Sequence, residues 1–154
     1  MDISNDLLIL LVSSLPIVEL RGAIPLGIIR GMSVGKVFFL SVLGNVLVII
    51  PLLLFFKWTV IRLEKIRSIG KILEWWFMRV RKKSKIVQAY GFWGLILFVA
   101  IPLPGTGAWT GAAAATLFNF KLPKAFLAIF LGVLIAGVLV TLGSLGIVKL
   151  WFVS

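Results

Sequence analysis

The stretch Ser13-Ser-Leu-Pro-Ile-Val-Glu-Leu-Arg-Gly-Ala-Ile-Pro25 decides how the first half of this chain folds. Prolines, a glycine and two charges interrupt it, so it is too broken to cross a lipid bilayer as one regular helix. A second stretch of this kind, Ile101-Pro-Leu-Pro-Gly-Thr-Gly-Ala-Trp-Thr-Gly111, lies in the second half. Paired broken apolar segments are the sequence pattern that points to a substrate site at mid-membrane.

The composition indicates an integral membrane protein. Hydrophobic residues make up 61% of the 154 residues and the mean hydropathy is +1.16, which is more apolar surface than a soluble domain of this size could bury. Asp2 and Asp6 stand where a signal peptide would carry basic residues, so we expect no cleaved leader. We expect one membrane domain over residues 1–154, crossing the plasma membrane several times.

The net charge of +11 is concentrated in one loop. Ten of the sixteen basic residues fall between Lys57 and Lys85. Such loops stay in the cytoplasm and attract anionic headgroups, so membrane lipid is the expected partner and nucleic acid is not. Within this loop, residues 58–80 have the spacing of an amphipathic helix that lies in the membrane plane.

The two halves of the chain align without a gap when one is shifted by 88 residues. The shift places Leu15-Pro16 on Leu103-Pro104, Lys36 on Lys124 and Leu43-Gly44 on Leu131-Gly132. Each half then contains a broken segment, a basic turn and a complete apolar span. The predicted units are repeat one at 7–56, a cytoplasmic basic amphipathic segment at 57–88, and repeat two at 89–150, with full spans at 37–56 and 125–148.

Each broken segment predicts two half-length helices that form a re-entrant hairpin. The predicted pieces are residues 7–15 and 22–30 in the first segment, and 92–103 and 105–118 in the second. The alternative for the first segment is one continuous kinked helix over residues 7–29. A hairpin does not cross the bilayer but the following span does, so repeat two is inverted. The predicted fold is an all-α integral membrane protein of two inverted repeats, each a re-entrant helical hairpin plus a full transmembrane helix, with both termini outside.

Two charged residues lie at the break of the first segment. Glu19 and Arg21 are the only charges between Asp6 and Arg30. A charge at the bilayer centre costs about 2.5–3.5 kcal/mol on insertion scales, so such residues mark a pathway, a proton relay or an ion pair. The structural alternative is a Glu19–Arg21 pair that holds the hairpin shut.

The second segment predicts an anion-binding loop that faces these charges. Helix N-termini attract anions, and the arginine fork binds phosphate or carboxylate. Glu19 would carry a proton, because burial favours the protonated form of a carboxyl group. For Trp109 the alternative is ordinary packing, and for Asn45 we expect a helix–helix hydrogen bond. The predicted substrate-binding residues are Glu19, Arg21, Gly22, Pro25, Pro104, Gly105, Thr106, Gly107, Trp109 and Thr110.

The residues that most enzymes use are missing. The chain contains no His and no Cys, and its single membrane-depth carboxylate cannot form an acid–base pair or a nucleophile dyad. We therefore expect no enzymatic activity, no cofactor and no metal.

The segments Glu19-Leu-Arg-Gly-Ala-Ile-Pro25 and Pro102-Leu-Pro-Gly-Thr-Gly-Ala-Trp-Thr-Gly111 resemble the signature motifs of the putative small multidrug export protein family, over nearly the whole chain. That family is similar to the DedA (VTT-domain) membrane proteins, which have facing re-entrant hairpins. The more distant resemblance implies translocation of lipid or lipid phosphate, often linked to protons. Glu19 and Arg21 match the DedA hairpin residues in kind, whereas the second segment lacks the arginine found there.

The expected function is a transporter that moves an anionic lipid or lipid-phosphate-like substrate by alternating access, coupled to protons. One protomer offers few full spans, so we expect a homodimer. One alternative is export of small hydrophobic cations, with Glu19 shared by drug and proton and Trp109 stacking on the drug. The other is a non-transporting membrane scaffold that binds partners or anionic lipid through residues 57–88.

Overall fold

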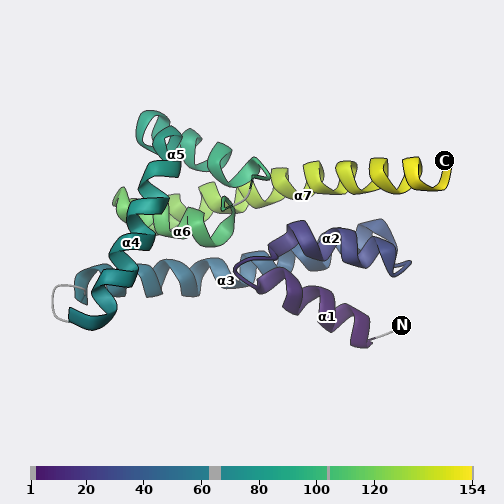
Figure 1. Ribbon diagram of the computed structural model, residues 1–154, viewed down its shortest axis with the longest axis horizontal. Helices are drawn as coiled ribbons and strands as arrows, with labels where there is room; N and C mark the ends of the chain where they lie inside the picture. Colours follow the sequence, from purple (N-terminus) through teal and green to yellow (C-terminus); the bar gives the residue numbers. More distant parts are fainter. Residues whose placement is uncertain (1–2, 63–66, 104, 154) are drawn as a thin grey trace.

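A computed structural model describes residues 3–62, 67–103 and 105–153. These residues form an all-helical protein, as predicted (Figure 1). The helices are α1 (Ile3–Ser14), α2 (Glu19–Ile29), α3 (Val34–Arg62), α4 (Arg67–Lys83), α5 (Lys85–Ala100), α6 (Ala108–Leu117) and α7 (Leu122–Val153).

Two of the helices are long and apolar enough to cross a membrane. Val34–Thr59 of α3 and Leu122–Ile147 of α7 each give 26 such residues. About 20 apolar residues are needed to span the hydrocarbon core, so both have length to spare. The predicted spans, residues 37–56 and 125–148, lie within these two helices. The chain is accordingly a membrane protein.

The first broken segment forms two helices and not one. Residues 15–18 separate α1 from α2, and the two helices pack side by side, with α2 running back along α1 (Figure 1). The alternative of one continuous helix over residues 7–29 is therefore wrong. In the second half, residues 101–107 separate α5 from α6 in the same way.

The basic loop differs from the prediction at both of its ends. The predicted amphipathic helix over residues 58–80 is divided, because residues 58–62 belong to α3 and α4 begins at Arg67; residues 63–66 lie outside the described part of the chain. At the other end, α5 begins at Lys85 and reverses sharply at Gly91, whose φ is 55° and ψ −122°. The predicted half-helix from residue 92 corresponds to the part of α5 after this reversal.

The two halves have the same backbone plan. A shift of 88 residues carries α2 onto residues 107–117 and the start of α3 onto residue 122, which are the places of α6 and α7. Gly31 (φ 75°) and Asn119 (φ 54°) end the second helix of each hairpin at corresponding positions. In both, the N–H of this residue donates to the carbonyl three residues earlier and the next N–H to the carbonyl five earlier. This is the Schellman motif, used identically in the two halves.

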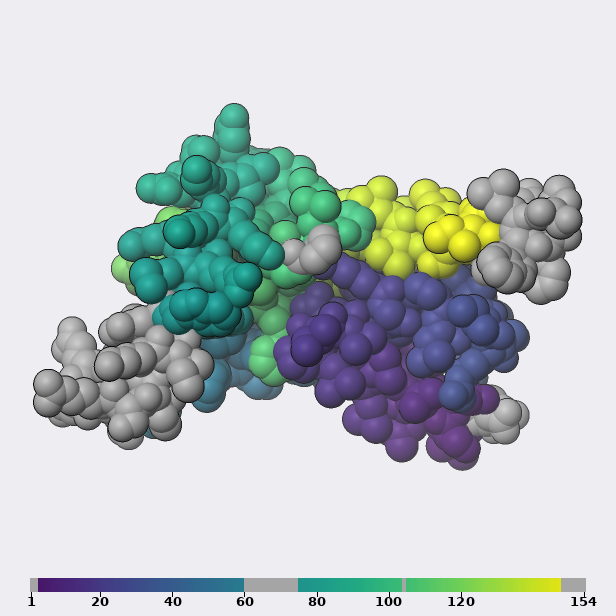
Figure 2. Space-filling view, viewed as in Figure 1, coloured from purple at the N-terminus to yellow at the C-terminus, as the bar shows by residue number. Residues whose placement is uncertain are grey.

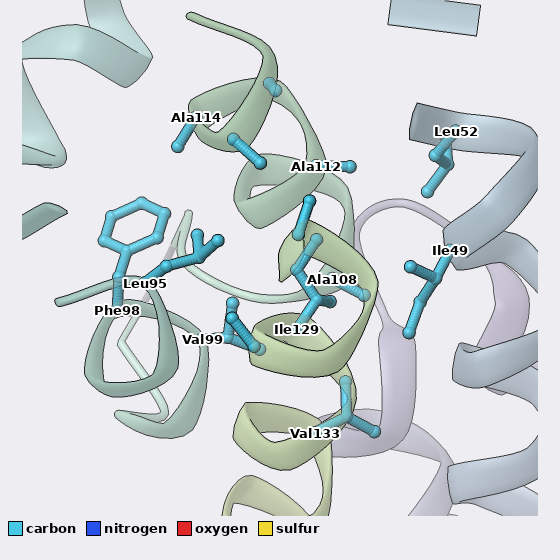
Figure 3. Packing of buried hydrophobic residues seen from close by; sticks show 14 of the residues in the cluster. Ile49, Leu52, Leu95, Phe98, Val99, Ala108, Ala112, Ala114, Ile129 and Val133 are labelled. Carbon is cyan, nitrogen blue, oxygen red and sulfur yellow. The ribbon is translucent and has the colours of Figure 1, made fainter. Parts of the chain in front are cut away.

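The core is built around the small residues of α6. Ala108 and residues 112–115 are at most 1% exposed. Figure 3 shows Ala108, Ala112 and Ala114 among the larger side chains of the core: Leu95, Phe98 and Val99 of α5, Ile129 and Val133 of α7, and Ile49 and Leu52 of α3. Small side chains let neighbouring backbones approach closely, which is how membrane helices associate without a hydrophobic driving force.

Glycines mark the places where the first helix of each hairpin crosses the long helix of its own half. A Cβ at Gly44 of α3 would lie 1.9 Å from Ser13 Oγ and 2.5 Å from Leu10 O of α1. A Cβ at Gly132 of α7, the corresponding residue, would lie 2.9 Å from Ile96 O of α5. These two crossings hold each hairpin against its own long helix and so position the turns between the hairpin helices.

We predict that Gly44→Ala destabilises the protein by about 1–3 kcal/mol, because the added methyl group meets backbone that cannot move aside. The matched control is Gly143→Ala in α7, where a Cβ meets nothing within 4 Å. Alanine favours helices over glycine by up to about 1 kcal/mol, so the control should be neutral or stabilising. Unfolding in detergent measures both; equal effects would contradict the close crossing.

Candidate functional site

Glu19 lies where the two broken segments meet. It begins α2, is 5% exposed, and has a φ of 49°, which is rare for a residue other than glycine. Its Oε1 accepts a hydrogen bond from the backbone N–H of Trp109 at 3.2 Å. Trp109 lies in the first turn of α6, so a carboxylate of the first hairpin caps the N-terminus of a helix of the second.

Gly107 makes room for this carboxylate. It is the residue before α6, and its φ of 136° is one that other residues rarely adopt. A Cβ at this position would lie 1.9 Å from Glu19 Oε2. Gly107, the N-cap residue of α6, has no side chain to cap this helix. Glu19 of the first hairpin caps it instead.

Arg21 reaches across the same boundary. Its guanidinium donates hydrogen bonds to Leu103 O, to Ile101 O at 3.3 Å and to Thr106 Oγ1 at 2.8 Å. Thr106 Oγ1 in turn lies 2.7 Å from Ile101 O and 2.9 Å from Leu103 O. These carbonyls follow the end of α5, and each also accepts a loop N–H, Ile101 O from Leu103 and Leu103 O from Thr106. The guanidinium adds a cation at the C-terminal end of a helix, where positive charge is favoured.

Trp109 makes the reciprocal contact. Its Nε1–H donates to the carbonyl of Ser14, the last residue of α1, at 3.2 Å. The shift of 88 residues places Arg21 on Trp109 and Glu19 on Gly107. Arg21 and Trp109 thus hold corresponding positions in the two hairpins. Each donates to backbone carbonyls at the end of the first helix of the other hairpin. We call Glu19, Arg21, Thr106, Gly107 and Trp109 the hairpin clasp.

The structural alternative, a direct pair between Glu19 and Arg21, is not formed. Within the described residues the two side chains make no ion pair within 4 Å, and each bonds to the second hairpin instead. The predicted anion site at the start of α6 is occupied by Glu19 itself. A role for this position in holding a substrate anion stays a prediction.

The remaining predicted site residues lie outside the clasp. A Cβ at Gly22 would meet Val18 of its own turn, and the Thr110 hydroxyl bonds back to Gly107 O at 3.4 Å. Pro25 is half-buried inside α2. Pro104 lies outside the described residues.

The sequence prediction missed Lys83 at the tip of the second hairpin. A Cβ at Gly105, whose φ is 79°, would lie 2.6 Å from Lys83 Nζ. Lys83 ends α4 and reaches this loop because α4 packs beside α5 and α6. In sequence it is one of several basic residues at 79–85, and nothing distinguishes it from its neighbours.

The clasp buries Glu19 and Gly107 and leaves Arg21, Thr106 and Trp109 partly exposed. Figure 2 shows the purple first hairpin lying against green segments of the second half in the middle of the molecule. Two pockets elsewhere in the molecule are lined by residues outside the clasp. One lies between α3, α6 and α7, and the other between α4 and α6.

The chain was compared with known protein families, and it matches the model of one of them. The family described as "Putative small multi-drug export protein" matches residues 19–139, from the first residue of α2 into α7. No curated protein and no solved structure matches the chain. The match covers most of the chain and contains every residue of the clasp. The chain belongs to the family of putative small multi-drug export proteins.

Proposed function

We propose that this chain exports small hydrophobic cations across the plasma membrane by alternating access at the hairpin clasp. The family description supports export. The observation that carries the proposal is the buried carboxylate of Glu19 at the boundary of the two hairpins. A carboxylate in such a site can bind an organic cation or a proton, and exchange of one for the other couples their movements.

The arrangement of the helices supports an inverted repeat of two re-entrant hairpins. α1 packs on α3 as α5 packs on α7, and each second hairpin helix also packs on the long helix of the other half. A two-fold axis in the membrane plane would relate the halves in this way. Glu19 and Gly107 correspond under the shift and touch each other, so they would lie on that axis.

The contacts of Arg21 favour a cation over an anion as substrate. Both of its terminal nitrogens bond to the second hairpin, so in this conformation the guanidinium has no fork turned toward a ligand. The helix N-terminus at α6 is likewise filled by Glu19. The anionic lipid substrate, and with it the DedA relationship, stays a prediction.

Opening of the clasp is the conformational step that the proposal requires. A hydrogen bond from a charged group contributes about 1.5–3 kcal/mol and one between neutral groups about 0.5–1.5 kcal/mol. The few bonds of Arg21 and Trp109 are therefore strong enough to keep the clasp closed at rest and weak enough to break during transport. In the proposed cycle, separation of the hairpins exposes Glu19 to one face, where a cation displaces its proton. A homodimer with the basic loop in the cytoplasm would provide the cavity that one protomer is too small to enclose.

The first prediction of this proposal concerns transport in liposomes. Glu19→Gln should lower pH-gradient-driven uptake of tetraphenylphosphonium by about tenfold or more, because the amide binds neither the cation nor a proton. Glu74→Gln on α4 makes the same chemical change outside the clasp and should leave uptake within about twofold of wild type.

Other outcomes would overturn the proposal. Full activity of Glu19→Gln would remove the carboxylate from the mechanism. Flipping of a fluorescent lipid phosphate that is lost in both Glu19→Gln and Arg21→Ala would establish the anionic substrate instead. Absence of flux of either kind in the wild-type protein would favour the membrane scaffold.

The second prediction concerns the strength of the clasp. Trp109→Phe removes the indole N–H that bonds Ser14 O but keeps an aromatic ring. We expect a loss of about 0.5–1.5 kcal/mol in unfolding free energy, the net value of one such bond. Trp93→Phe, at an exposed position on α5, is the control and should change stability little. If the two variants unfold alike, Trp109 does not close the clasp.

A further inference from the structure

Buried polar side chains line the interface between α1 and α3. Ser13 and Ser41 are fully buried and Asn45 is 1% exposed. Asn45 Nδ2 donates to Ser13 O at 2.9 Å and to Ser41 O at 3.2 Å, so the predicted helix–helix hydrogen bond of Asn45 is formed. We call Asp6, Ser13, Ser14, Lys36, Ser41 and Asn45 the polar seam.

Two oxygen atoms in the seam have no protein partner. Within the described residues, three buried seam oxygens make no hydrogen bond: Asp6 Oδ1 is paired with Lys36 Nζ as an ion pair, whereas Asn45 Oδ1 and Ser41 Oγ have no protein partner. The amide of Asn45 cannot be turned to remedy this, because its nitrogen is held by two carbonyl acceptors. Buried polar atoms are nearly always hydrogen-bonded, to ordered water where the protein supplies no partner. An acceptor and a hydroxyl one helical turn apart are suited to bridging by water.

The seam connects the surface of the protein to the clasp. At its outer end, Lys36 Nζ lies 2.7 Å from Asp6 Oδ1, and both side chains are partly exposed. At its inner end, Ser14 bonds through Oγ to Gly44 O at 3.1 Å. The carbonyl of Ser14 accepts the indole N–H of Trp109, whose backbone N–H bonds Glu19. Polar groups thus lie at both ends of this helix interface: a partly exposed ion pair at the surface and, at the inner end, the bonds that lead to the buried carboxylate.

The second half packs the corresponding helices, α5 and α7, without the polar residues found at Ser41 and Asn45. The shift of 88 residues places Ser41 on Ile129 and Asn45 on Val133, and both of these apolar residues are at most 1% exposed. Packing of a hairpin on its long helix therefore does not need polar residues. Their presence in the first half alone gives Glu19 a polar approach from one side of the fold.

We propose that the polar seam binds water at Asn45 Oδ1 and Ser41 Oγ and carries water and protons between the Asp6–Lys36 face and Glu19. The transfer of protons rests on the proposed function, whereas the binding of water does not. While the clasp is closed, the seam would let Glu19 exchange protons only with the side of the membrane that the Asp6–Lys36 face contacts. The apolar interface of the second half would keep the opposite approach dry.

Cysteine accessibility tests the seam directly, since the chain has no native Cys. Ser41→Cys and Ile129→Cys are made at corresponding positions, with Asn45→Cys and Val133→Cys as a second pair. Each variant in liposomes is exposed to Ag⁺, then denatured and labelled with a maleimide that reacts only with unprotected thiols. Cys is smaller than the Ile129 and Val133 side chains that it replaces, so these two control variants gain space. Any error from this extra space makes the control cysteines more accessible to Ag⁺ and therefore reduces the expected difference. Only variants that elute and unfold like wild type are compared.

We expect Ag⁺ to protect the seam cysteines at least about tenfold faster than their counterparts, because a wet site admits an ion and a dry one does not. Protection should require Ag⁺ on the side of the Asp6–Lys36 face. Equal and slow protection in both pairs, or protection from the opposite side alone, would overturn the proposal. The measurement needs no transport, so a protein that shows the contrast but moves no cation would contradict the proposed function and leave the hydrated seam standing.

Discussion

The hydrogen bonds that the buried Glu19 and the partly exposed Arg21 make across the boundary between the hairpins are the constraint on which the rest of the structure depends. Neither Glu19 nor Arg21 finds its partners within its own hairpin, since both bond to residues 101–109 of the second half. A buried charge without partners would cost several kcal/mol. The first hairpin is therefore stable in this form only against the second, and the two long helices serve to bring them together.

The fold joins two similar backbones that carry different chemistry. Arg21 and Trp109 occupy corresponding positions, and each donates hydrogen bonds to carbonyls of the opposite hairpin. Arg21 is charged and Trp109 is not. Glu19 and Gly107 are the second pair of corresponding residues. The Glu19 side chain fills the space beside Gly107, so the site has room for one carboxylate and not two. The polar seam of the first half has an apolar counterpart in the second. In the function that we propose, the symmetry of the two halves would give access from both sides of the membrane, and their asymmetry would give the clasp a single carboxylate.

Much of the fold follows from local sequence, and the contacts of the site do not. Pro16 and the loop around residues 101–107 interrupt apolar segments, and uncharged stretches of about 20 residues specify the two long helices. Arg21 could be recognised as important because intramembrane charge is rare, but its acceptors are mostly backbone carbonyls, which carry no sequence signal. The reversal at Gly91 and the approach of Lys83 to Gly105 depend on how α4 packs, which no periodicity reveals.

The contact between Arg21 and Thr106 is the one bond between two side chains in the hairpin clasp, and a double-mutant cycle measures it directly. Arg21→Met and Thr106→Val keep the size of each side chain and remove its hydrogen bonding. The unfolding free energies of the single and double variants in detergent should give a coupling of about 0.5–2 kcal/mol, as for residues in contact. Additivity within about 0.3 kcal/mol would mean that the two broken segments do not clasp each other.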